Sequence, residues 1–162
     1  MKKFRTLHIC VMLIIFIGLL TITQKANAID VNDELYCLAQ NIFFEARGES
    51  TKGQLMVAAV TINRANHKSF PNTICGAVWQ RKQFSWTHDG KHDNPERMGK
   101  TDRLEWAKIK HLADLVLNQP NHVLPKTQAL YYHADYVKPF WIKHKAYLGK
   151  VGTHLFYKNK ER

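Results

Sequence analysis

The sequence predicts an α+β fold in a single domain, on three observations. Two apolar stretches with helical spacing occupy residues 33–47 and 51–65. A third helical pattern covers residues 102–118, and aromatic-rich segments typical of strands follow at 129–133 and 152–158. No internal repeat, low-complexity segment or linker divides the chain. We therefore expect a helical core with a small β region at the C-terminal end.

The first 28 residues are predicted to be a secretory signal peptide. Lys2, Lys3 and Arg5 form a basic start, an apolar run follows from Ile9 to Leu20, and Ala26–Ala28 offers small residues for cleavage. The apolar run is shorter than the roughly 20 residues that a membrane span needs, and no later segment is apolar enough to span one. An uncleaved N-terminal anchor is the alternative. We expect a mature single domain of residues 29–162, exported to the periplasm or the extracellular cell wall.

The charge of the chain restricts its partners. The formal net charge is +11, and removal of residues 1–28, which hold four basic residues and no acids, leaves +7. Such a surface suits nucleic acid, anionic lipid or an acidic wall polymer. Export argues against nucleic acid and favours an anionic cell-wall polymer. We expect the protein to act as a monomer.

The first helix is predicted from Asp33 to Arg47, with Asn32 or Asp33 as its cap and Gly48 at its end. Apolar residues occupy most of its sides, which is typical of a central, buried helix. The second helix follows after a tight Gly-Glu-Ser turn and runs to Ala65, and Thr51 and Gln54 have capping-box spacing. The two helices form a hairpin with residues 45–49, Glu-Ala-Arg-Gly-Glu, at its tip.

The rest of the chain is more irregular. Residues 70–80 begin as a turn and can continue as one short helix, residues 83–86 are predicted to be extended, and residues 88–100 read as a loop. Pro120 stops the third helix. The residues that we expect this helix to turn inward are Leu104, Ala107, Leu112, Leu115 and Val116.

Two cysteines remain after the signal peptide, with its Cys10, is removed. Cys37 and Cys75 form an even pair in a disulfide-permissive compartment. A bridge would close a loop of about 38 residues and stabilise the fold by up to roughly 4 kcal/mol. Two buried thiols are the alternative.

Glu45 is an acidic residue within the largely apolar first helix, directly after Phe43 and Phe44. On a helical wheel it lies about 20° from Leu38 and about 60° from Ile42, at the border of the apolar stripe. Partial burial raises the pKa of a carboxyl, and a carboxyl that is still protonated near neutral pH can donate a proton to a leaving oxygen. The alternative is a structural ion pair with Arg47 or Arg64.

Five blocks of sequence occur in the order and spacing of a known family. They are "IFFEARGESTKGQLMVAAVTINRA", "FPNTICGAVWQ", "QFSW", "YYHADYVKPFW" and "VGTHLFY". In them the chain resembles the SleB/CwlJ-type cell wall hydrolases, the spore cortex-lytic enzyme family. The resemblance implies peptidoglycan cleavage between sugars, as a lytic transglycosylase, with no cofactor or metal. It also implies a fold related to lysozyme and resuscitation-factor domains, and it makes Glu45 the catalytic residue.

The number of acids bears on the reaction. A glycosidase with two carboxylates needs the second acid about 5–9.5 Å from the first. Glu49 is expected to turn toward backbone amides or Arg47, and Asp89 and Asp135 lie in polar segments. A transglycosylase avoids this requirement, because the 6-hydroxyl of muramic acid attacks and one carboxyl serves as acid and then as base. The hairpin tip and the second helix supply residues that we expect to be structural: Arg47, Gly48, Glu49, Asn63 and Arg64.

Further residues are candidates for binding sugars. Phe84, Ser85 and Trp86 combine aromatic rings with a hydroxyl, as a sugar groove does, although core packing explains them equally well. Many Gram-negative-type members of the family that the chain resembles carry cysteines on both sides of this segment, where Lys82 and His88 stand here. The candidates for the opposite wall are Tyr132 and His133, and those expected to hydrogen-bond near Glu45 are His154 and Tyr157.

Three other functions fit parts of the sequence. A muramidase would hydrolyse the same glycan. A zinc N-acetylmuramoyl-L-alanine amidase would cut the sugar–peptide bond, with possible ligands in His88, Asp89, His92, His133 and His154. A non-catalytic wall-binding module would use only the aromatic and basic surface.

Overall fold

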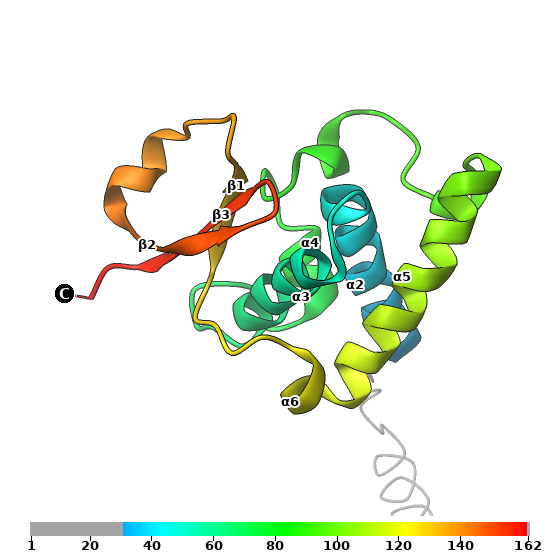
Figure 1. Ribbon diagram of the computed structural model, residues 1–162, viewed down its shortest axis with the longest axis horizontal. Coiled ribbons are helices and arrows are strands. Elements are labelled where there is room, and N and C mark those ends of the chain that lie inside the picture. The colour runs from blue at the N-terminus through cyan, green and yellow to red at the C-terminus, as the bar shows by residue number, and fades with distance from the viewer. Residues whose placement is uncertain (1–30, 162) are drawn as a thin grey trace, which may run out of the picture.

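The structure, a computed structural model, describes residues 31–161. The predicted signal peptide, residues 1–28, lies outside the described residues. Helices α2 and α3 lie between a small sheet on one side and helix α5 on the other (Figure 1). The predicted α+β class and the single domain are confirmed. Within residues 31–161, no helix has the length and apolar content that crossing a membrane requires.

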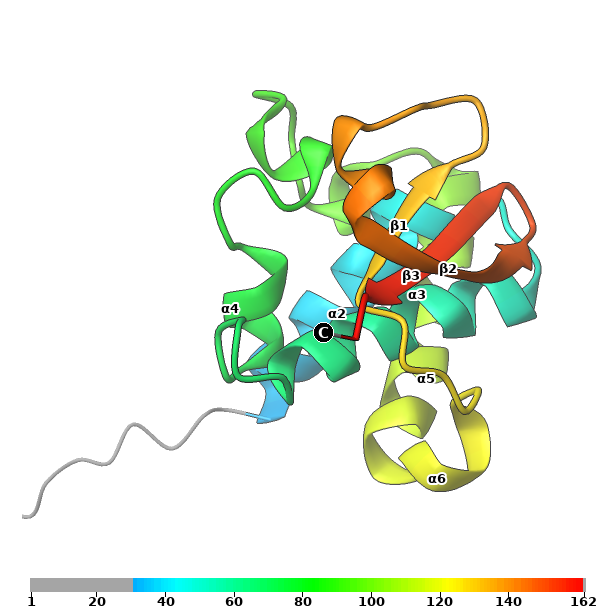
Figure 2. The ribbon, with the colours of Figure 1, turned by 90° about the vertical axis from the view of Figure 1, so that its left-hand side faces the viewer.

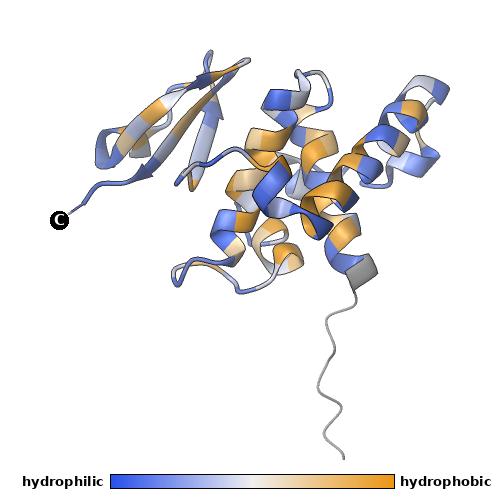
Figure 3. Cartoon of the chain, turned by 60° about the horizontal axis from the view of Figure 1, so that its bottom comes forward, coloured by the Kyte–Doolittle hydropathy of each residue, from blue (hydrophilic) through white to orange (hydrophobic). Residues whose placement is uncertain are grey.

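The helical hairpin forms close to the predicted bounds. Helix α2 spans Val31–Ala46 and α3 spans Thr51–Ala65. The N-cap of α3 is Ser50, whose hydroxyl accepts from the backbone N–H of Gly53, so the cap lies one residue before the predicted Thr51. Both helices are mostly buried, and hydrophobic residues concentrate on them in Figure 3. The central position expected for α2 is confirmed.

Helix α5 (Lys100–Asn118) packs on α2 through a face that matches the predicted one only in part. Val116 is buried as expected, and Leu112 and Leu115 are half-buried. Leu104 is 59% exposed and Ala107 is also exposed, whereas Trp106 and Ile109 are buried. Trp106 meets the rings of Tyr36 and Phe43 edge-on, at centroid distances of 5.4 and 5.9 Å. The large indole therefore sets the rotation of the helix. The short α6 (Pro120–Val123) follows directly.

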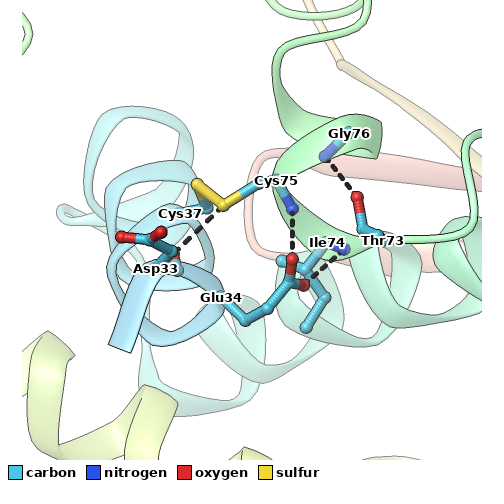
Figure 4. The surroundings of a disulfide bond; sticks show 7 residues. All are labelled: Asp33, Glu34, Cys37, Thr73, Ile74, Cys75 and Gly76. Atoms are coloured by element: carbon cyan, nitrogen blue, oxygen red, sulfur yellow. Dashed lines mark hydrogen bonds between the residues drawn. A yellow bond between two sulfur atoms is a disulfide. The ribbon is translucent and has the colours of Figure 1, made fainter. Parts of the chain in front are cut away.

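A disulfide joins α2 to α4 (Ile74–Val78), as predicted. Cys37 and Cys75 are 38 residues apart in sequence and their Cα atoms are 5.1 Å apart. Glu34, one turn earlier on α2, accepts a 2.6 Å hydrogen bond from the backbone N–H of Ile74, at the start of α4 (Figure 4). The Thr73 side chain caps the same helix at the N–H of Gly76. The bridge and the carboxylate thus fix α4 against α2.

The described residues form one three-stranded antiparallel sheet with strand order β1-β3-β2. Its strands are β1 (Tyr131–Ala134), β2 (Lys145–Val151) and β3 (His154–Asn159). The first and third strands were predicted, and β2 was missed, because apolar and polar residues do not alternate regularly in its sequence, KAYLGKV. Phe156 and Ala129 pack on Met56 and Val60 of α3, and this contact places the sheet beside the hairpin (Figure 2).

In the described part of the chain, three 3₁₀ helices occupy the connections: Ser85–His88, Pro95–Arg97 and Phe140–His144. The prediction of an extended segment at residues 83–86 was wrong, because the chain turns into the first of these helices at Ser85. Trp86 is thereby turned into the core, where its ring stacks on Phe44 at a centroid distance of 4.6 Å.

Candidate active site

A pocket of about 590 Å³ lies where the end of α2, the segment 82–88 and strand β1 come together. The segment that follows β1, from Tyr136 to Trp141, forms its outer rim. Several predicted site residues line it, and they come from distant parts of the chain: Glu45, Arg64, Phe84, Ser85, Tyr132, His133 and His154.

Glu45 stands on the last turn of α2 and is the acidic residue in the lining of this pocket. Burial raises the pKa of its carboxyl; a hydrogen bond from Tyr132 and the positive charge of Arg64 oppose that effect without cancelling it. Among the residues that the structure describes, no basic side chain forms a salt bridge with it. The wheel prediction therefore holds for this position: the carboxyl is half-buried and faces an open space.

Tyr132 holds the Glu45 carboxyl in place. Its hydroxyl donates a 3.1 Å hydrogen bond to Oε2 of Glu45, and its ring lies edge-on to His154 and tilted against Phe84. Burial raises the pKa of this hydroxyl well above its usual range, and the nearby Glu45 raises it further, so it remains a donor. Sequence reasoning placed Tyr132 on the pocket wall but missed this bond, which depends on how the sheet docks on the hairpin.

Arg64 is held by hydrogen bonds to other segments of the chain and forms no salt bridge with Glu45 in residues 31–161. Its side chain is buried, and Nε donates to the carbonyl oxygen of Leu130 at 2.7 Å. With the Gln83 amide oxygen turned toward the guanidinium, both terminal nitrogens donate to it at 3.0 Å. The preceding Asn63 donates to the carbonyls of Thr127 and Ala129. This pair of residues ties α3 to the approach of β1 and to the segment 82–88.

Glu49 stays outside the pocket lining and fastens the hairpin tip to the sheet. Its carboxylate accepts from the backbone N–H and the hydroxyl of Thr153, in the turn between β2 and β3. These bonds to Thr153 lower the pKa of Glu49. A backbone amide as partner agrees with the prediction, but Arg47 instead faces Asp102 of α5, at 3.6 Å. Gly48, in the connection between the two helices, is exposed and has free space around it.

The two histidines and Tyr157 differ in their positions. Nε2 of His133 lies 3.0 Å from the Tyr157 hydroxyl, and the two rings stack. Tyr157 is buried outside the pocket lining, so the expected bond near Glu45 is absent for this residue. His154 lines the pocket, with Nδ1 3.8 Å from Glu49, and burial lowers the pKa of its ring. It contacts the site through Tyr132 and not through Glu45.

The three candidate sugar-binding residues of the "QFSW" segment lie in different surroundings. Phe84 and Ser85 line the pocket, the first buried and the second exposed. Trp86 lies in the core between Phe44 and Trp79 and does not reach the pocket, so the alternative of core packing holds for this residue. In residues 31–161 we find no group of three or more His, Cys, Asp or Glu side chains arranged to hold a metal ion.

The fold and this site belong to a defined class of protein. The sequence model of the cell wall hydrolase family matches residues 48–157, more than half of the chain, and the protein is therefore a member of that family. Glu45 lies three residues before the match begins, so its assignment depends on the geometry described above.

Particular relatives sharpen the classification. The chain is 31% identical over 127 residues to the spore cortex-lytic enzyme of Bacillus subtilis, covering 77% of this chain and 37% of that one. It is 32% identical over 138 residues to the Bacillus cereus enzyme, covering 84% and 48%. The chain thus spans less than half the length of these relatives. The catalytic domain of the germination-specific lytic transglycosylase SleB from Bacillus anthracis matches with a TM-score of 0.58 and 29% identity, covering 78% of this chain and 94% of that domain.

Proposed function

We propose that this protein is an exported, peptidoglycan-cleaving enzyme that acts on the glycan strand as a lytic transglycosylase. Residues 1–28 serve as the signal peptide and residues 29–162 as the catalytic domain. The observation that carries the proposal is Glu45: a carboxyl with a raised pKa, free of an ion pair in the described part of the chain, lining an open pocket. The membership in the cell wall hydrolase family supports the same substrate.

Glu45 acts first as a general acid. Its proton passes to the oxygen that links muramic acid to the next sugar, the bond from that oxygen to C1 breaks, and positive charge develops on the muramic acid ring. The carboxylate left behind is stabilised by the Tyr132 hydroxyl and by the charge of Arg64. These two groups therefore stabilise the form of Glu45 that exists after the proton has left.

Glu45 then acts as a general base. It takes the proton from the 6-hydroxyl of the same muramic acid, the oxygen forms a bond to C1, and a 1,6-anhydro ring closes. This route needs only one carboxyl. Among the described residues that line the pocket, Glu45 is the only acidic one, which supports this route. A muramidase would need water, activated by a second group, in the place of the 6-hydroxyl.

The substitution Glu45→Gln tests the proposal. Gln keeps the size of the side chain and can still accept from Tyr132, but it cannot donate the proton. We expect the release of muropeptides from purified sacculi to fall by about 10²–10⁴-fold, with binding to sacculi retained. Glu161→Gln, at an exposed glutamate that pairs with Lys158, is the matched control and should retain full activity.

Mass spectrometry of the wild-type products identifies the reaction. Anhydro ends support the transglycosylase, reducing-end muramic acid indicates a muramidase, and free peptides indicate an amidase. Turnover of Glu45→Gln at the wild-type rate would remove this residue from the mechanism. Sacculi that bind the protein but release nothing at any pH would leave a wall-binding module.

A further inference from the structure

The charged side chains of the pocket differ in how accessible they are. Arg64 is 3% exposed and committed to Leu130 and Gln83. Lys82 is exposed, lines the pocket and forms no salt bridge with any residue in the range 31–161. Of the two permanently charged basic residues that line the pocket, Lys82 is therefore the one that a bound ligand can reach.

Two of the three histidines of the lining, His133 and His154, do not supply a second accessible cation, and the third, His88, is bonded to the backbone of its own loop. Both ring nitrogens of His133 have partners, the carbonyl oxygen of Ala134 at 2.8 Å and the Tyr157 hydroxyl at 3.0 Å. Burial lowers the pKa of His154, which keeps this ring neutral at neutral pH. The permanent, exposed positive charge of the pocket wall thus resides on Lys82.

The backbone holds Lys82 in an uncommon conformation. Its φ angle is +62°, in the left-handed region. Among residues 31–161, Lys82 is the only residue other than glycine with a positive φ angle. A glycine would adopt this conformation without the steric cost, of about 1 kcal/mol or more, that a side chain brings. Residues kept in such conformations cluster at functional sites.

His88 maintains that conformation. Its Nε2 accepts a 2.6 Å hydrogen bond from the backbone N–H of Lys82, and its Nδ1 lies 2.7 Å from the carbonyl oxygen of Thr87. Together these contacts require the tautomer with the proton on Nδ1. The bond to Lys82 closes the loop 82–88, and the contact with Thr87 fixes the orientation of the ring. The same loop carries the pocket residues Gln83, Phe84 and Ser85.

We infer that Lys82 is a specificity-determining residue, whose ammonium group binds a carboxylate that the glycan strand carries beside the cleaved bond; this rests on the proposed function. Muramic acid provides such a group in its lactyl substituent, either as the free carboxylate or through the acidic stem peptide attached to it. His88 is the positioning residue that keeps Lys82 at the wall. The pocket then favours glycan with free carboxylates over neutral glycan.

Three matched substrates test the inference: solubilised glycan strands with their peptides, the same strands stripped by an amidase to leave the lactyl carboxylate, and stripped strands amidated with a carbodiimide. We expect Lys82→Met to raise KM about three- to fivefold on strands that carry the recognised carboxylate, with kcat changed less than about twofold. The ratio of variant to wild-type KM should return to one on amidated strands. Lys82→Arg, which keeps the charge, should restore the preference.

The same series identifies the carboxylate. A KM ratio that falls to one when the peptides are removed assigns the contact to the stem peptide, whereas a ratio that persists until amidation assigns it to the lactyl group. The wild-type preference should also shrink between about 50 and 500 mM salt, because exposed charge pairs are screened. Lys68→Met, at an exposed lysine between α3 and α4, is the matched control.

The positioning role of His88 is tested by a double-mutant cycle on peptide-bearing and amidated strands. His88→Ala should lower the preference for carboxylates in the wild type and leave it unchanged in Lys82→Met, since both changes remove one contact. Equal KM ratios on all three substrates, no effect of Lys82→Met, or the same loss in Lys68→Met would overturn the inference. Titration calorimetry with the three soluble substrates measures the preference without turnover. An active Glu45→Gln variant or an unexpected product would therefore contradict the proposed function separately from this inference.

Discussion

The two walls of the pocket are built in different ways. The wall with Glu45 belongs to α2, whose Leu38, Ile42 and Phe43 have no exposed surface and which a disulfide ties to α4. The opposite wall consists of the segment 82–88 and the rim after β1, where Tyr136 and Phe140 are 84% and 83% exposed. The carboxyl that we propose as the general acid thus stands on the buried helix, and Lys82 and Ser85, which we expect to contact the substrate, stand on an exposed loop.

This difference separates what each wall contributes. A general acid must be held within a fraction of an ångström of its proton acceptor, which a buried helix provides. A loop stabilised by a few hydrogen bonds, such as that of Lys82 to His88, tolerates changes of sequence and of substrate. We therefore expect substitutions beneath the helical wall to change stability and substitutions on the loop wall to change recognition.

Removal of the disulfide should have the largest effect and should fall on stability alone. The double substitution of Cys37 and Cys75 by Ala frees a loop of 38 residues, and we expect a loss of up to about 4 kcal/mol in the free energy of unfolding. Urea denaturation measures this loss. Reduced wild-type protein should behave like the variant, because both lack the same constraint. A large loss of kcat in the folded variant would contradict the separation of the two walls.

Substitution of Gly152 should have the next largest effect, because this residue lies where the tip of the helical hairpin meets the sheet. It has a φ angle of +58° in the β2–β3 turn, and a Cβ added there would collide with the Glu49 carboxylate. We expect Gly152→Ala to lower the free energy of unfolding by about 2–3 kcal/mol. The control is Gly90→Ala, where φ is +72° and a Cβ meets nothing within 4 Å, so it should cost only about 1 kcal/mol. Equal losses in both variants would show that the Glu49 contact is unimportant.

The helical wall was also the part that the sequence predicted well. The apolar pattern of residues 33–65 is continuous, and a helix that is apolar on most sides can only be buried, which placed Glu45 at the edge of the core. The pairing of Cys37 with Cys75 followed from counting the cysteines of a chain that is predicted to be exported.

The sequence predicted the loop wall less well, because tertiary contacts decide it. Trp86 belongs to the core only because the chain turns into a 3₁₀ helix at Ser85. This helix has four residues and is too short to be predicted from hydrophobic periodicity. The bonds of Tyr132 to Glu45 and of Glu49 to Thr153 join residues 87 and 104 positions apart. Such contacts depend on the docking of the sheet on α3, which local patterns do not encode.

Loss of the Tyr132 hydroxyl tests the hydrogen bond that joins strand β1 to the Glu45 carboxyl of α2. We expect Tyr132→Phe to lower kcat about tenfold, which corresponds to about 1.4 kcal/mol, because the Glu45 carboxylate loses a hydrogen bond that stabilises it. The same bond lowers the pKa of Glu45, so its loss raises that pKa and moves the alkaline limb of the pH–rate profile to higher pH. Tyr131→Phe is the control: its hydroxyl bonds to Asn159, away from the pocket, and the profile should not move. An unshifted limb in Tyr132→Phe would mean that Glu45 is not the titrating acid.

The smallest expected effect is a gain of stability on the helical wall. Burial raises the pKa of Glu45 in the folded state, so the folded protein holds a proton that the unfolded chain releases above its ordinary pKa. Stability is therefore lost as the pH rises through the interval between the two pKa values, and the loss persists above it. A glutamine amide does not ionise, so the Glu45→Gln variant should melt at a higher temperature than the wild type at about pH 7 to 8 and at the same temperature near about pH 3. The variant that we expect to lose turnover would then be the more stable protein. This result is expected where a buried acid serves catalysis at the expense of stability. Identical melting temperatures of the variant and the wild type at every pH would mean that burial of the Glu45 carboxyl does not lower the stability of the fold.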